Sequence, residues 1–65
     1  MIYRIVYSEN KNLTVPRTFP TRAKAFIHIR DSLPPGCYDI QAKADDYDRI
    51  EHNPWAHFDT VNTVD

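Results

Sequence analysis

The sequence predicts one small α+β domain of two layers, in which a helix over about residues 21–33 packs on a mostly antiparallel sheet of three or four strands. Three observations predict it: a β-branched and aromatic run at the start, one central segment of helical period, and alternation of apolar and polar residues after it. A chain of 65 residues has room for a single core, so we assign residues 1–65 to one domain.

Two strands are expected before the helix. Residues 2–7 are rich in isoleucine, valine and tyrosine, with apolar side chains on both faces. The turn-forming residues 8–12 follow, and residues 13–15 are expected to return as a short strand that Pro16 ends.

The helix is expected to begin at Thr21, whose hydroxyl suits an N-cap, and to end before the run Pro34-Pro35-Gly36, where the prolines cannot continue the hydrogen-bond ladder. Its apolar residues form a stripe that is expected to face the sheet. The stripe comprises Ala25, Phe26, Ile29 and Leu33, widened by Ala23 and Ile27.

After the helix, residues 38–44 alternate with period two and are expected to form a strand with one buried face. The acidic residues 45–52 favour a helical turn, because carboxylates suit the first turn of a helix. Asn53-Pro54 indicates a turn, and residues 57–64 are predicted to form the last strand. Trp55 is expected in the core, with an exposed contact residue as the alternative.

Charge is sorted along the chain. Residues 1–38 carry six basic side chains against two acidic ones, a net charge of +4, whereas residues 39–65 carry two against seven, a net charge of −5. The formal net charge of −1 hides this asymmetry. It indicates either a macromolecular partner or two halves that neutralise each other within one fold.

Composition excludes several classes. A single cysteine, Cys37, cannot form an internal disulfide, and no apolar run is long enough for a signal peptide or a transmembrane helix. We therefore expect a cytoplasmic protein and, because Met1 leads directly into a strand, a complete gene product.

Catalytic and metal-binding patterns are weak. His52 and His57 have the spacing of half a zinc site, but no cysteine pair accompanies them, and the acidic run lacks the central glycine of a calcium loop. Gly36 is the only glycine, which excludes a glycine-rich phosphate loop. We expect no enzyme activity, no catalytic residues, no metal and no cofactor.

The leading hypothesis is a small interaction protein that occludes or modulates a larger macromolecule through an acidic, nucleic-acid-mimicking surface. Its partner would be a protein, such as one that binds nucleic acid, and phage- or plasmid-encoded inhibitors of host machinery are an analogy from size alone. The expected contact residues are Asp45, Asp46, Asp48, Glu51, Trp55 and Asp59.

Two alternatives stay open. The first is a nucleic-acid-binding regulator that uses the basic half of the chain, and the second is a small metal-dependent enzyme built on His52, His57 and the aspartates. A homodimer is also expected if Ile2 and Val6 stay uncovered on the second face of the first strand. The basic residues of the first alternative are Arg4, Lys11, Arg17, Arg22, Lys24 and Arg30.

Overall fold

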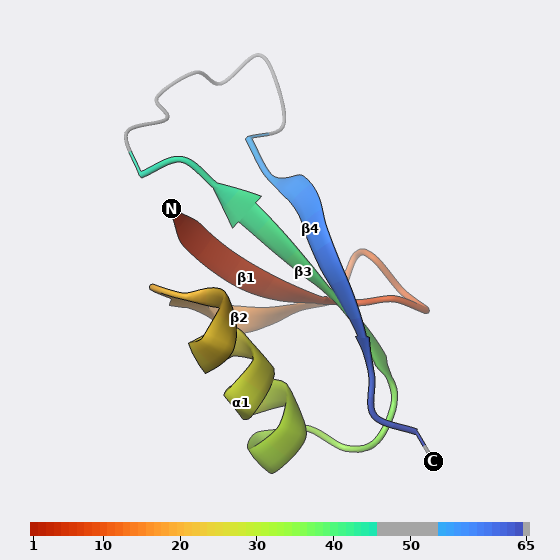
Figure 1. Cartoon of the computed structure of the whole chain (residues 1–65). Coiled ribbons are helices and arrows are strands. Elements are labelled where there is room, and N and C mark those ends of the chain that lie inside the picture. Colours follow the sequence, from red (N-terminus) through yellow and green to blue (C-terminus); the bar gives the residue numbers. More distant parts are fainter. Residues whose placement is uncertain (46–53, 65) are drawn as a thin grey trace.

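The computed structural model describes residues 1–45 and 54–64 and has one helix on a four-stranded antiparallel sheet (Figure 1). This confirms the predicted α+β class. The described elements are, in chain order, β1 (Ile2–Tyr7), β2 (Thr14–Phe19), α1 (Arg22–Ser32), β3 (Cys37–Lys43) and β4 (Ala56–Asn62).

The strands lie in the order β2-β1-β3-β4, and each is antiparallel to its neighbours. Because β2 and β3 both flank β1, α1 carries the chain across β1 on one side of the sheet (Figure 1). The helix packs mainly on β1, β2 and β3. We call this side the helix face and the other side the open face.

Thr21 caps α1 as predicted, since its hydroxyl oxygen accepts a hydrogen bond from the backbone N–H of Lys24 at 3.2 Å. The helix ends at Ser32, and Leu33 is extended, as the following proline requires. Ala25 and Ile29 are fully buried, with Phe26 and Leu33 packed beside them. The expectation for Ala23 and Ile27 was wrong, because both residues are exposed and Ile27, at 46%, lies on the outer side of α1.

The prediction that Pro16 ends the second strand was also wrong, because β2 continues through it to Phe19. β2 is an edge strand, where a missing N–H need not break a ladder on both sides. The pairing of β1 with β2 is irregular between Arg4 and Val6, and the extra residues of β2 sit in this irregularity.

β3 and β4 start and end within a residue or two of the predicted strands. Their ladder contains a bulge, since Ile40 is opposite Asp59 whereas Gln41 is opposite His57, so Phe58 has no partner in β3. The predicted helical turn over residues 45–52 lies almost wholly outside the described residues.

The core lies between α1 and the helix face and contains Ile5, Phe19, Ile29, Tyr38 and Ile40, among others. Val6 points to the open face and is nevertheless only 1% exposed. The expectation that Val6 offers an uncovered association surface was therefore wrong, because this single chain already covers it.

Ile40, at the centre of β3, is fully buried and tests this core. We expect Ile40→Ala to lower the free energy of unfolding by about 3 kcal/mol, through lost burial and the cavity left behind. Leu13→Ala, at an exposed loop position, is the control and should change it by less than about 0.5 kcal/mol. Urea denaturation measures both, and equal losses in the two variants would contradict the assigned core.

Candidate binding surfaces

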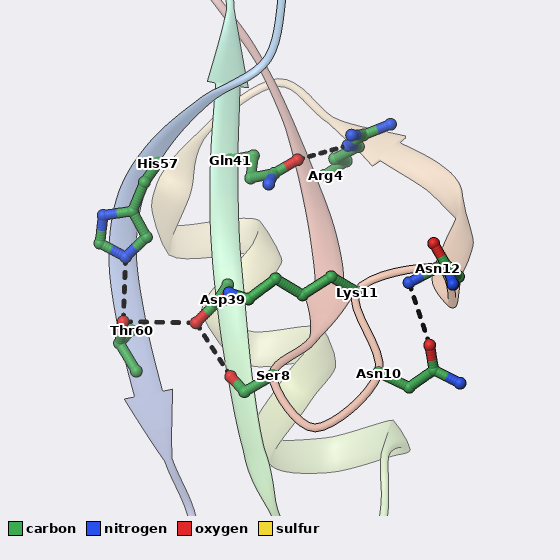
Figure 2. Close-up of polar contacts among 9 residues, drawn as sticks. All are labelled: Arg4, Ser8, Asn10, Lys11, Asn12, Asp39, Gln41, His57 and Thr60. Carbon is green, nitrogen blue, oxygen red and sulfur yellow. Dashed lines mark hydrogen bonds and ion pairs between the residues drawn. The ribbon is translucent and has the colours of Figure 1, made fainter. Parts of the chain in front are cut away.

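A buried carboxylate organises the open face. Asp39 is 5% exposed and accepts hydrogen bonds from Ser8 Oγ at 2.9 Å, Lys11 Nζ at 2.6 Å and Thr60 Oγ1 at 3.4 Å. Figure 2 shows the Lys11 side chain reaching across to Asp39 from the loop between β1 and β2. These bonds fasten that loop and β4 to β3, and they satisfy the carboxylate as burial requires.

The same contacts set the ionisation of this carboxyl group. The hydrogen bond from Lys11 is the main reason that the pKa of Asp39 lies below its ordinary value of 3.8, and burial opposes it only in part. All buried polar side-chain atoms in the described part of the chain have a hydrogen-bond partner. Asp39 is thus a structural anchor whose bonding capacity is already used.

His57 extends this network without gaining a catalytic arrangement. Its Nε2 lies 3.0 Å from Thr60 Oγ1, which in turn contacts Asp39 (Figure 2). Within residues 1–45 and 54–64, no three His, Cys, Asp or Glu side chains gather as a metal site would require. His52, the other half of the predicted pair, lies outside the described residues.

Trp55 lies on the open face beside two cations. The guanidinium of Arg4 is 4.5 Å from the centre of the indole ring, and the ammonium of Lys43 is 5.1 Å from it. Arg4 also donates from Nε to Gln41 Oε1 at 2.8 Å (Figure 2), and partial burial lowers its pKa. The prediction of a core tryptophan was wrong, because Trp55 is only half-buried and lies outside the core cluster.

The sorted charges of the sequence meet inside the fold. Three of the four ion pairs among the described residues join the basic half of the chain to the acidic half. These three are the pairs Met1 ammonium–Asp45, Lys11–Asp39 and Arg22–Asp59. Neutralisation between the halves, which the sequence left open, therefore accounts for much of the asymmetry.

The predicted acidic contact residues are not brought to one surface where the structure describes them. Asp59 accepts from Arg22 Nε at 2.8 Å on the helix face, and this contact lowers its pKa. Asp45 is paired with the N-terminal ammonium, while Trp55 faces the open side. Asp46, Asp48 and Glu51 lie outside the described residues, so their role stays a prediction.

The predicted basic residues are dispersed as well. Lys11, Arg22 and Arg30 are each paired with a carboxylate, and Arg4 lies against Trp55. Arg17 and Lys24 have no carboxylate partner among the residues that the structure describes. Both lie at the same place in the fold.

That place is a groove of about 390 Å³ between β2 and the outer side of α1, which we call the β2–α1 groove. Strand residues form one wall and helix residues the other. The strand wall and its end contribute Arg17, Thr18, Phe19 and Pro20, and the helix contributes Lys24, Ile27, His28, Asp31 and Ser32.

Stacked side chains form the floor of the β2–α1 groove. Phe19 is 4% exposed, and its ring lies 5.2 Å from both the Arg17 guanidinium and the His28 ring. Ile27 adds an exposed apolar side chain. The acidic member, Asp31, is bound to Arg30 through a 2.9 Å hydrogen bond, which leaves Arg17 and Lys24 as the unmatched charges.

Sequence reasoning missed this groove. No pattern in the sequence places an edge strand beside Lys24 and His28 on the outer side of the helix. The continuation of β2 beyond Pro16 creates the second wall.

A smaller hollow of about 220 Å³ lies where the turn after α1 meets β1 and β3. Cys37 and Glu9 are among its lining residues, and the Tyr38 hydroxyl donates to the Pro34 carbonyl at 2.6 Å beside them. Cys37 is half-buried, and the turn residues around it are prolines and glycine. Glu9, which forms no ion pair among the described residues, is its only charged lining residue, and the hollow has no cation.

Comparisons with protein-family models, curated proteins and solved structures found no match for the chain. The described residues include no helix with the length and hydrophobicity needed to span a bilayer.

The buried Asp39 predicts how stability depends on pH. Its pKa is lowered in the folded state, so its contribution is complete above the ordinary value of 3.8 and is lost as the pH falls through the lowered value. At pH 7 we expect Asp39→Asn to be less stable by roughly 1–2 kcal/mol, with the difference from wild type closing below about pH 4.

Denaturant unfolding between pH 2.5 and 7 would measure this, with Asp31→Asn as the control because its ion pair with Arg30 is exposed on both sides. The control should follow the wild-type profile closely. A constant difference between wild type and Asp39→Asn down to about pH 2.5 would contradict the assigned role.

Proposed function

We propose that the chain is a small non-enzymatic binding protein whose partner is another protein. The β2–α1 groove is the observation that carries this proposal. It lies beside an edge strand whose outer side has no partner strand among the described residues, and it combines an apolar floor with two unmatched cations. Grooves beside an exposed sheet edge suit extended segments of other proteins, because main-chain hydrogen bonds and side-chain pockets are available together.

Nucleic acid is the less favoured partner. A phosphate-tracking surface needs several cations on one side of the molecule, since each phosphate neutralised adds to affinity. Here three of the six predicted basic residues are held in ion pairs, and Arg4 lies on the opposite face from the β2–α1 groove. A metal-dependent enzyme has still less support, because His57 contacts Thr60 and no cluster of metal ligands forms in the described part of the chain.

The proposed class of function is therefore the one expected from the sequence, but the proposed contact surface is a different one. We still propose an interaction protein, and the β2–α1 groove replaces the acidic segment as the favoured contact surface. The possibility of a nucleic-acid-mimicking surface rests on Asp46, Asp48 and Glu51, which lie outside the described residues.

The experiment compares the wild-type protein with the double variant Arg17→Glu/Lys24→Glu in affinity capture from a nuclease-treated lysate. We expect a defined protein to be retained by the wild type and lost with the double variant. Lys43→Glu is the matched control, because it reverses one charge on the open face and should retain the same protein.

The parallel measurement is fluorescence anisotropy with a labelled single-stranded oligonucleotide at low and moderate salt. The proposal expects no binding beyond weak, non-specific attraction. Tight, salt-dependent oligonucleotide binding that the double variant abolishes would overturn it in favour of a nucleic-acid regulator.

A further inference from the structure

Charge and shape at the β2–α1 groove specify the chemistry of its occupant more narrowly. We infer that it takes an acidic, extended peptide segment that adds to the outer edge of β2 as a fifth strand and places carboxylates beside Arg17 and Lys24. This inference rests on the proposed function and names the partner's chemistry.

The edge of β2 supplies the first part of the argument. β2 is paired with β1 on one side only, and its residues Arg17, Thr18 and Phe19 line the groove. A strand edge with unpaired N–H and C=O groups is a template for a further strand. Pro16 withholds one donor near the start of β2, so pairing is expected at Arg17, Thr18 and Phe19, beside the groove.

Side-chain chemistry supplies the second part. A strand added to β2 presents every second side chain to the helix face, where α1 forms the opposite wall of the groove. Apolar side chains there would meet the half-exposed Ile27 and the Phe19 ring. Carboxylates would lie between two cations that have no carboxylate of their own among the described residues.

Selection against other peptides follows from the same arrangement. A basic peptide would bring like charges next to Arg17 and Lys24, and it would gain nothing from Asp31, which Arg30 already neutralises. The Arg17 guanidinium lies over the Phe19 ring, and this contact keeps the cation beside the groove although the residue is exposed. Acidic segments are therefore the complementary class.

The test uses fluorescein-labelled synthetic peptides of about eight residues, a length that matches one strand. The first repeats Glu-Thr-Val-Thr, so that Glu and Val share the face turned to the groove, and we call it the Glu–Val peptide. The second has Lys in place of Glu, and the third, the Glu–Pro peptide, has Pro in place of Thr. The third keeps the charge of the first and lacks the N–H donors at alternate positions, so it separates strand addition from simple charge attraction. Binding is measured by anisotropy with the full chain, and amide shifts in NMR spectra locate it.

We expect only the Glu–Val peptide to bind, with the largest amide shifts at residues 17–20 and an affinity that falls with added salt. Single reversals Arg17→Glu and Lys24→Glu should each weaken it about fivefold, and Ile27→Ser about threefold. Lys43→Glu, on the open face, should leave it unchanged.

Three results would overturn the inference. They are equal binding of the Glu–Pro and Glu–Val peptides, equal sensitivity to Lys43→Glu and Lys24→Glu, and failure of every peptide while the groove variants aggregate. The last result would mean that Arg17 and Lys24 only guard an exposed strand edge. If the peptides fail but a protein is still captured through the groove, the partner's chemistry is wrong and the proposed function stands.

Discussion

Among the described elements, a single short helix packs on a four-stranded sheet and is too narrow to cover it. Adjacent strands are about 4.8 Å apart and a helix is about 10 Å wide, so α1 covers the strands around β1 and leaves much of β4 to other contacts. β4 is held instead by its ladder with β3 and by the ion pair between Arg22 and Asp59. Phe58 stays 46% exposed as a result, with its ring against Tyr3.

The open face is also incompletely covered by apolar packing, and it is stabilised in a different way. No second helix covers it in the described part of the chain, yet Val6 is buried there. The loop between β1 and β2 folds back so that Ser8 and Lys11 reach Asp39, which lies directly opposite Val6. The hydrogen bonds of Asp39 thus hold neighbouring elements together on the open face, as apolar packing does on the helix face. This role also explains why a carboxylate is found in the middle of so small a sheet.

The Arg22–Asp59 ion pair and the hydrogen bonds of Asp39 change the interpretation of the charge pattern. A chain with a basic first half and an acidic second half suggests a dipole that awaits a partner. In the fold, β1 and β3 are neighbours, and charges of opposite sign meet across elements that are distant in sequence. At the β2–α1 groove only the cations Arg17 and Lys24 remain without a carboxylate partner among the described residues. They are candidates for binding because they lie beside a strand edge that no described strand covers.

Local signals made much of the fold predictable. Thr21 and the prolines at 34 and 35 fixed the limits of α1, and the alternation after residue 37 fixed β3. The errors came from non-local constraints. Pro16 is tolerated because β2 happens to be an edge strand, and Ile27 is exposed because α1 is rotated to bury Ala25 and Ile29.

The candidate site was harder to predict for the same reason. Its walls come from two elements whose proximity depends on sheet order, and no residue spacing encodes that order. Arg17 and Lys24 were predicted as cations of a phosphate-binding surface. The other four basic residues differ from these two because Lys11, Arg22 and Arg30 form ion pairs and Arg4 lies against Trp55.

The bulge at Phe58 has a consequence for how insertions and deletions would act on this chain. In a regular strand His57 and Thr60, three positions apart, would point to opposite faces, yet here they share a hydrogen bond. The additional residue therefore allows two side chains that are three positions apart in the sequence to lie on the same face of β4. Removing Phe58 would leave His57 and Asp59 adjacent and still opposite Gln41 and Ile40, so the ladder would become regular and the other side chains of β4 would keep their faces. A single-codon deletion at Phe58 would thus keep the pairing of β4 with β3, whereas the same deletion at a paired position of β4 would turn part of the strand over.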